Sequence, residues 1–207
     1  MKCNNINISS KTIHIKGTDN AKINVNGNEK EGVTTMLTIT ESGDMLKPII
    51  IAKGKITGCL KKYKLTNNVI GSYSNNGWMN VGIIKLLIDD VNKHSNNNNT
   101  CLLLDHYSSH CTEYIKTYAL SKNIKLIYVP SGYTYKFQPL DVGINGIIKQ
   151  KSKSTWRTKK IKNPGLKIIN DDAIKYLMES INSLSKETIK KSFIKSFFTL
   201  PLIFFKK

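Results

Sequence analysis

The chain has 207 residues, a length that suits one domain with a small appendage. It carries 32 basic and 14 acidic residues, and this net charge of +18 favours a polyanionic partner, nucleic acid before membrane. All the basic residues except Arg157 are lysine, and asparagine and isoleucine are abundant. A drift towards AT-rich codons therefore accounts for part of the charge, and the partner class needs support from motifs.

Other compositional features exclude several classes of protein. The four cysteines form no CxxC pair and no signal peptide is evident, which predicts free thiols in a reducing compartment rather than a secreted disulfide scaffold. No apolar run approaches the ~20 residues that span a bilayer. With a mean hydropathy of -0.29, the sequence predicts an intracellular, non-membrane protein.

The first third of the chain predicts a β-rich region. The first ten residues are polar and show no clear element, and short β-like runs follow at 12–15 and 21–25. Residues 33–40 and 45–52 are stronger strand candidates around the turn ESGD, which predicts a hairpin. Pro48 places the second of these strands at an edge or an end.

The middle of the chain predicts helices that alternate with strands. Residues 54–76 are rich in Gly, Asn, Ser and Lys and predict a loop, and residues 78–92 then place apolar side chains on one helical face. The run CLLL at 101–104 is apolar at successive positions, which predicts a central strand buried on both faces. A helix over 110–122, capped by Ser108 or Ser109, and a strand over 124–129 follow.

The last third predicts helices. Pro139 suits a first helical turn, which puts Asp141 near a helix N-terminus. After the NPG breaker, a pair of short helices is predicted over 169–198. The whole order predicts an α/β fold with a central mixed sheet flanked by helices. We expect a polar segment at 1–10, a domain at 11–155 and a basic helical extension at 156–207.

Two aspartates stand where α/β proteins place chemistry. Asp105 ends a predicted strand and Asp141 begins a predicted helix, and ligands gather outside the carboxyl ends of strands. Two carboxylates there can hold Mg²⁺, but the spacing alone equally allows ordinary turn residues. A zinc site with His106 and His110 is disfavoured because further Cys or His partners are lacking.

The residues around these aspartates resemble a known family. The block LLLDHYSSH, the strand IKLIYVP and the run QPLDVG (138–143) resemble the DDE superfamily transposases and integrases, in particular the pogo, Tigger and jerky-like branch that includes centromere protein B. Thirty-five residues separate Asp105 from Asp141, a spacing that this branch uses. The resemblance covers roughly residues 11–155. His106 departs from the asparagine that is common in the family after this aspartate.

The resemblance implies a ribonuclease-H-like fold, Mg²⁺ or Mn²⁺, and metal-dependent DNA cleavage with strand transfer. Asp105 and Asp141 would be catalytic carboxylates and metal ligands, with His110 and Gln138 in supporting roles. The first catalytic aspartate of the family, and the strand that bears it, find no match here, since Asp19 and Asp44 do not fit the motif. We therefore expect the chain to be N-terminally truncated, its first strand missing or altered, and inactive in strand transfer alone.

A basic segment supplies the predicted contact with DNA. Residues 149–162 hold seven basic residues and no acid, which favours a phosphate-contacting face or a nuclear import signal over a merely solvated helix face. The predicted DNA-binding residues are Lys149, Lys151, Lys153, Arg157, Lys159 and Lys160. In a eukaryotic host we expect a nuclear protein.

Three further questions stay open at this point. The alternative function is a non-catalytic, domesticated DNA-binding or interaction module on the same fold, and homo-oligomerisation is left open. Tyr128, Tyr133 and Tyr135 lie near the loop before Asp141, where contact with DNA competes with ordinary packing as the simpler interpretation.

Overall fold

The computed structural model describes residues 2–3, 33–163 and 170–196. The predicted strands at 12–15 and 21–25 lie outside these ranges. The described strands form two hydrogen-bonded sheets. The first sheet has the order β1-β2-β3-β4, made of Lys2–Cys3, Val33–Met36, Ile49–Lys53 and Ile70–Ser74. The second pairs β5 (Thr100–Asp105) with β6 (Ile124–Val129).

The predicted hairpin is confirmed. Strand β2 runs antiparallel to β3, with Thr34 opposite Ile51, and an isolated bridge from Ile39 to Met45 extends the pairing towards the turn. Pro48 directly precedes the first residue of β3, which is consistent with a residue that cannot donate to the ladder. Strand β3 is an inner strand, however, because it also pairs in parallel with β4.

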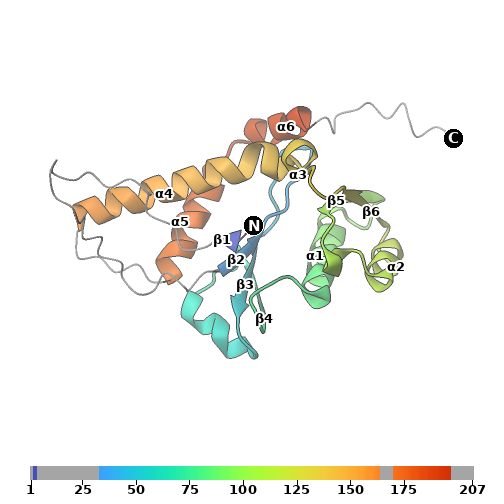
Figure 1. Ribbon diagram of the computed structural model, residues 1–207, viewed down its shortest axis with the longest axis horizontal. Coiled ribbons are helices and arrows are strands. Elements are labelled where there is room, and N and C mark those ends of the chain that lie inside the picture. The colour runs from blue at the N-terminus through green and yellow to red at the C-terminus, as the bar shows by residue number, and fades with distance from the viewer. Residues whose placement is uncertain (1, 4–32, 164–169, 197–207) are drawn as a thin grey trace.

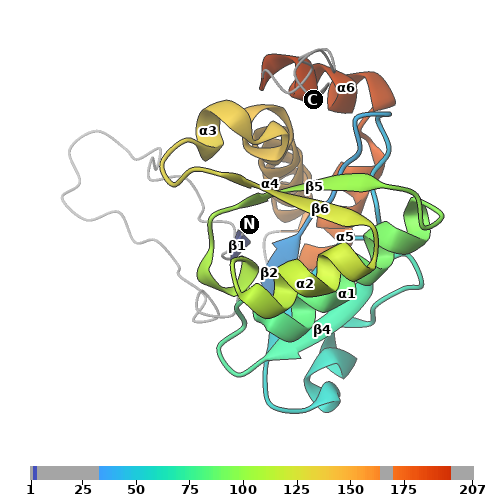
Figure 2. The ribbon, with the colours of Figure 1, turned by 90° about the vertical axis from the view of Figure 1, so that its right-hand side faces the viewer.

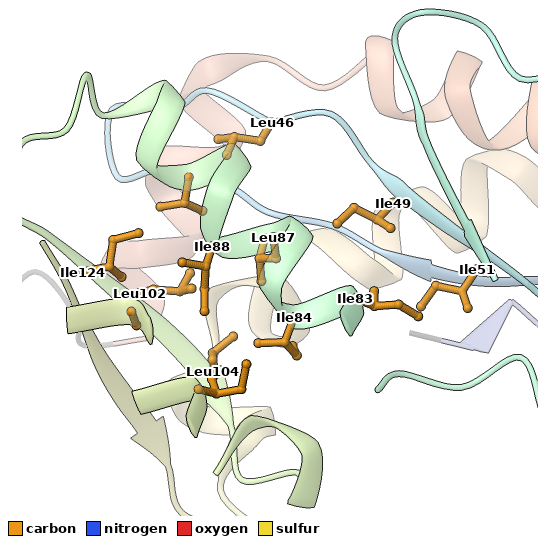
Figure 3. Close-up of a cluster of buried hydrophobic side chains, with 13 residues drawn as sticks. Leu46, Ile49, Ile51, Ile83, Ile84, Leu87, Ile88, Leu102, Leu104 and Ile124 are labelled. Atoms are coloured by element: carbon orange, nitrogen blue, oxygen red, sulfur yellow. The ribbon is translucent and has the colours of Figure 1, made fainter. Parts of the chain in front are cut away.

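Strand β3 is the strand that is buried on both faces. Its alternating residues enter two separate cores, because successive side chains of a strand point to opposite faces. Ile49 and Ile51 pack in the first core with helix α1 (Val81–His94) and with strands β5 and β6. Figure 3 shows these side chains meeting around α1. Ile50 and Ala52 enter the second core, against the C-terminal helices.

The predicted central strand at 101–104 is buried on one face only. Leu102 and Leu104 are buried against α1, but Leu103 is half-buried and Cys101 is exposed. The prediction of burial on both faces was wrong because an unbroken apolar run does not show whether a second layer covers the strand. The loop predicted over 54–76 was also wrong, since it contains the 3₁₀ helix η1 (Thr57–Tyr63) and strand β4.

Helix α1 confirms the predicted helix at 78–92. Its N-cap is Asn80, whose side-chain oxygen accepts the Ile83 N–H at 3.0 Å. Helix α2 (Glu113–Ser121) begins later than predicted, because the Thr112 hydroxyl accepts the Ile115 N–H. The 3₁₀ helix η2 (Ser108–His110) occupies the positions expected for the cap.

The C-terminal helices cover the other face of the first sheet. A short helix α3 (Thr134–Phe137) leads into the π-helical turn η3 (Leu140–Ile144) and then into α4 (Asn145–Lys162). Helices α5 (Asn170–Asn182) and α6 (Lys186–Lys195) confirm the predicted helical pair. Figure 1 shows α4 and α5 on one side of the four-stranded sheet, with α1, α2, β5 and β6 on the other.

The predicted mixed α/β class is confirmed. The second core includes residues of α4, α5 and α6 and therefore extends past residue 155, where a domain boundary is predicted. No helix in the described ranges is long and apolar enough to cross a membrane. Within those ranges Cys59, Cys101 and Cys111 are free thiols, as predicted.

Candidate functional site at the ends of strands β5 and β6

Asp105 is the last residue of β5 and pairs in register with Val129 at the end of β6. Its side chain is 46% exposed, so the carboxylate reaches solvent at the carboxyl end of the parallel pair. The hydrogen bond from the His110 ring lowers the pKa of the Asp105 carboxyl below its ordinary value and outweighs the opposing effect of burial. Asp105 is therefore an ionised carboxylate at neutral pH.

His110 holds this carboxylate. Its ring is buried, and Nδ1 lies 2.8 Å from the Asp105 carboxylate oxygen Oδ1 and 3.1 Å from the Asp105 main-chain carbonyl oxygen. The Tyr128 hydroxyl donates a 2.7 Å hydrogen bond to the His110 carbonyl and fixes the backbone there. The structure thus brings together Asp105 and His110, which are five residues apart, while the exposed His106 makes an edge contact with the Tyr128 ring.

Asp141 lies in the π-helical turn η3, a rare form that often occurs at functional sites. The main-chain carbonyl of Gln138 accepts the N–H groups of Asp141 at 2.9 Å and of Val142 at 3.0 Å. Gln138 therefore supports the turn through its backbone. The Asp141 carboxylate is exposed, and its Oδ1 accepts a 2.7 Å hydrogen bond from the Asn145 amide.

Asn145 is a site residue that the sequence analysis missed. It stands four residues after Asp141, the spacing at which side chains of a helix meet, and this periodicity could have identified it. Its Oδ1 is buried without a hydrogen-bond partner among the described residues. Asn145 therefore orients Asp141 much as His110 orients Asp105.

Helix α6 braces the turn that carries Asp141. At Gly143 an added Cβ would lie 2.8 Å from the Ser192 Cβ, so the turn and α6 approach more closely than a larger residue allows. Ser192 is buried in this contact. The glycine of the QPLDVG run is thus explained by packing.

The two aspartate carboxylates are ligands of the chemical type that binds a hard divalent cation. Mg²⁺ takes oxygen ligands such as carboxylates. Asp105 is the last residue of β5, and Asp141 lies in η3, which follows β6 after the short helix α3. Each uses Oδ1 for the hydrogen bond to its neighbour. The described residues contain no group of three or more His, Cys, Asp or Glu side chains that could hold a metal, and no hydrogen bond or ion pair within them joins the two aspartates.

The predicted DNA-binding residues of α4 differ in their surroundings. Lys149 and Arg157 are exposed, and Lys153 is half-buried. The Lys151 ammonium donates to the Ser183 hydroxyl at 2.8 Å, and the Lys159 ammonium lies 4.2 Å from the Tyr176 ring centroid. Lys151 and Lys159 therefore hold α4 against α5, which leaves Lys149 and Arg157 the best placed to meet phosphates.

The fold and the site together define an α/β domain with one oriented carboxylate at the end of β5 and another in the π-helical turn that follows β6 and α3. Residues 30–193 match the DDE superfamily endonuclease family, and the chain belongs to this family. No curated protein matches the chain. Among solved structures it is similar to the Mos1 transposase paired-end complex with left transposon end, at 9% identity and a TM-score of 0.45, over 90% of this chain. The chain spans 50% of that transposase chain.

Proposed function

We propose that this chain is a nucleic-acid-binding, ribonuclease-H-like domain of the pogo, Tigger and jerky-like branch, related to metal-dependent DNA cleavage and strand transfer. The observation that carries the proposal is the ionised Asp105 carboxylate, held by His110 at the end of β5. The family match spans this site and Asp141.

Asp105 and Asp141 are the residues that would hold Mg²⁺ or Mn²⁺. When bound, such an ion supplies charge stabilisation and a more acidic attacking hydroxyl for phosphodiester chemistry. The chain's own residues provide orientation: His110 fixes one carboxylate, and Asn145 fixes the other. In a eukaryotic host the basic segment 149–162 would also direct nuclear import.

Strand transfer needs more ligands than these two carboxylates. Asp44, the other candidate within the described ranges, lies in the hairpin turn and forms a 2.8 Å ion pair with Lys186. We therefore propose that the chain binds DNA and metal but performs no strand transfer alone. The alternative is a non-catalytic, domesticated DNA-binding or interaction module on the same fold.

Metal binding can be measured without any assay of cleavage. Electron paramagnetic resonance should show Mn²⁺ bound by the wild-type chain and lost in Asp105→Asn and Asp141→Asn. Glu113→Gln, which changes an exposed acid on α2, is the matched control and should retain binding. The metal-site proposal fails if the Asp variants and the control bind equally.

Nicking of supercoiled plasmid tests the second half of the proposal. We expect none with Mg²⁺ or Mn²⁺, although the chain binds the plasmid. Nicking that Asp105→Asn abolishes would show a complete active site and overturn the proposed inactivity.

A further inference from the structure

Exposed tyrosines lie on the chain directly after β5 and on the chain between β6 and η3. Tyr107 is 37% exposed, Tyr133 is 51% exposed and Tyr135 is 71% exposed. Large aromatic side chains are normally more deeply buried than this, because each one carries a large apolar surface. Tyr133 and Tyr135 are the more exposed of the three and lie two residues apart.

Backbone hydrogen bonds tie two of these tyrosines to the strand ends. The Tyr107 N–H donates to the Asp105 carbonyl at 2.9 Å. Asp105 pairs with Val129, and the next residue, Pro130, accepts the Tyr133 N–H at 3.1 Å. Figure 2 shows the chain running from β6 to α3, the segment that carries Tyr135.

Tyr128 differs from Tyr133 and Tyr135 in its burial and in its hydrogen bonding. Tyr128 is half-buried, and its hydroxyl is used in the hydrogen bond to the His110 carbonyl. This is the packing role that the sequence analysis preferred. The hydroxyls of Tyr133 and Tyr135 make no hydrogen bond to any residue in the described ranges, and their rings face solvent to the extent given above.

The surroundings of the two tyrosines are aromatic and cationic. The Tyr133 ring lies 6.1 Å from the Phe137 ring, and the exposed Lys136 ammonium lies 5.4 Å from the Phe137 centroid. From Pro130 to Leu140 the chain contains no acidic residue. Exposed aromatic faces beside a cation are the combination with which proteins bind single-stranded nucleic acid, because every base has a face that stacks.

We propose that Tyr133 and Tyr135 form a stacking site for unpaired bases of a nucleic-acid strand at the candidate carboxylate site. The inference rests on the proposed function and deepens it, because it assigns the form of the substrate: a strand end whose bases have left the duplex. Tyr107 lies two residues after Asp105, and its ring centroid lies 5.5 Å from that of His110.

The test compares one DNA sequence as a single strand with a central 2-aminopurine and as a fully paired duplex. The Tyr133→Ala/Tyr135→Ala variant should lose about 5- to 100-fold in affinity for the single strand, with duplex affinity almost unchanged. Stacking quenches 2-aminopurine fluorescence, and this quench at saturation should also disappear. Tyr133→Phe/Tyr135→Phe should retain both signals, because stacking needs only the ring.

Two further variants make the result decisive. Tyr114→Ala removes a 54% exposed tyrosine from α2 and should leave single-strand binding intact. Lys149→Ala/Arg157→Ala should weaken binding of both DNA forms while the saturating quench persists, and its failure to do so would count against the proposed DNA-binding face alone. The stacking site would be overturned if Tyr133→Ala/Tyr135→Ala lost affinity equally for both DNA forms, or lost none. It would also be overturned if Tyr133→Phe/Tyr135→Phe bound the single strand as weakly as the Ala variant.

Discussion

At the scale of single residues, each aspartate of the site is oriented by one neighbour. A half-exposed carboxylate such as Asp105 would sample several rotamers in water, but the buried His110 ring donates to it and fixes one of them. The hydrogen bond also favours the charged form of the carboxyl. Asn145 orients Asp141 in the same way but as a neutral donor. The Asp105 carboxylate is therefore held by a hydrogen bond that also favours its charged form, whereas the Asp141 carboxylate is held by a neutral amide.

His110→Ala should raise the pKa of Asp105 towards its ordinary value, because the donor that stabilises the carboxylate is lost. Loss of the buried ring and its hydrogen bonds should also reduce the free energy of unfolding by about 1–3 kcal/mol. Carbon-13 NMR of the Asp105 carboxyl measures the pKa, and urea unfolding measures the stability. His106→Ala, at an exposed neighbouring position, should change neither quantity; a similar effect of both variants would argue against the His110 contact.

At the scale of elements, helix α6 joins two parts of the fold that are distant in the chain. Its middle packs against the π-helical turn of Asp141 at Gly143. Its first residue, Lys186, pairs with Asp44 of the hairpin turn at 2.8 Å and lies against Gly43, where φ is +93°. Only glycine fits at position 43 without strain. A side chain is disfavoured at this positive φ, and an added Cβ would lie 2.7 Å from the Lys186 carbonyl oxygen. The C-terminal helix therefore contributes to the position of Asp141.

Gly143→Ala should destabilise the fold by about 1–3 kcal/mol, because its Cβ overlaps the Ser192 Cβ and two packed backbones must separate. Gly146→Ala is the matched control on the same stretch of helix. No atom lies within 4 Å of its added Cβ, so the substitution should be neutral or stabilising by up to about 1 kcal/mol. Urea unfolding of both variants gives the comparison, and equal destabilisation would exclude the close contact with α6.

The ion pair between Asp44 and Lys186 predicts a pH-dependent contribution to stability. The hydrogen bond from Lys186, with a second from Ser42, lowers the pKa of Asp44 below 3.8. A carboxyl with a lowered folded-state pKa stabilises the fold above the unfolded value, and this contribution is lost as pH falls through the folded value. The urea midpoint of Asp44→Asn should therefore lie below that of wild type at neutral pH and converge with it below pH 3.8. Glu41→Gln, which changes an exposed acid of the same turn, is the matched control and should keep the wild-type urea midpoint at neutral pH.

At the scale of the whole molecule, the sequence predicted the helices and the β-hairpin better than the layering. The i, i+3, i+4 pattern located α1 because one face of a helix is enough to define it. The strands IIIA and CLLL are equally apolar, yet only the first is covered on both faces, since C-terminal helices distant in the chain cover it. Strand β4 contains glycine and serines and is formed by pairing with β3, which no local pattern shows. At the site, Asp105, His110 and Asp141 were predicted from motifs, and Asn145 follows from its i, i+4 spacing to Asp141, whereas the π-helical form of the turn depends on its packing against α6.

The exposed basic residues of α4 predict how DNA affinity depends on salt concentration. Each phosphate contact on duplex DNA releases counterions and steepens the log–log dependence of affinity on salt by about 0.9. Lys149→Ala/Arg157→Ala should therefore reduce that slope by about 1.8 if each residue meets one phosphate. Fluorescence anisotropy with a short duplex between about 50 and 200 mM salt measures it.

Lys151→Ala distinguishes a binding face from general positive charge. The Lys151 ammonium donates to both the hydroxyl and the carbonyl oxygen of Ser183, so its main role is to join α4 to α5. We expect this variant to lower the urea midpoint while leaving the salt slope close to that of wild type. If instead every lysine of α4 changed the slope equally, the net charge of the chain rather than an oriented face would account for binding. The contrast between Lys149 and Lys151, two residues apart on one helix, then decides whether α4 presents a defined surface to DNA.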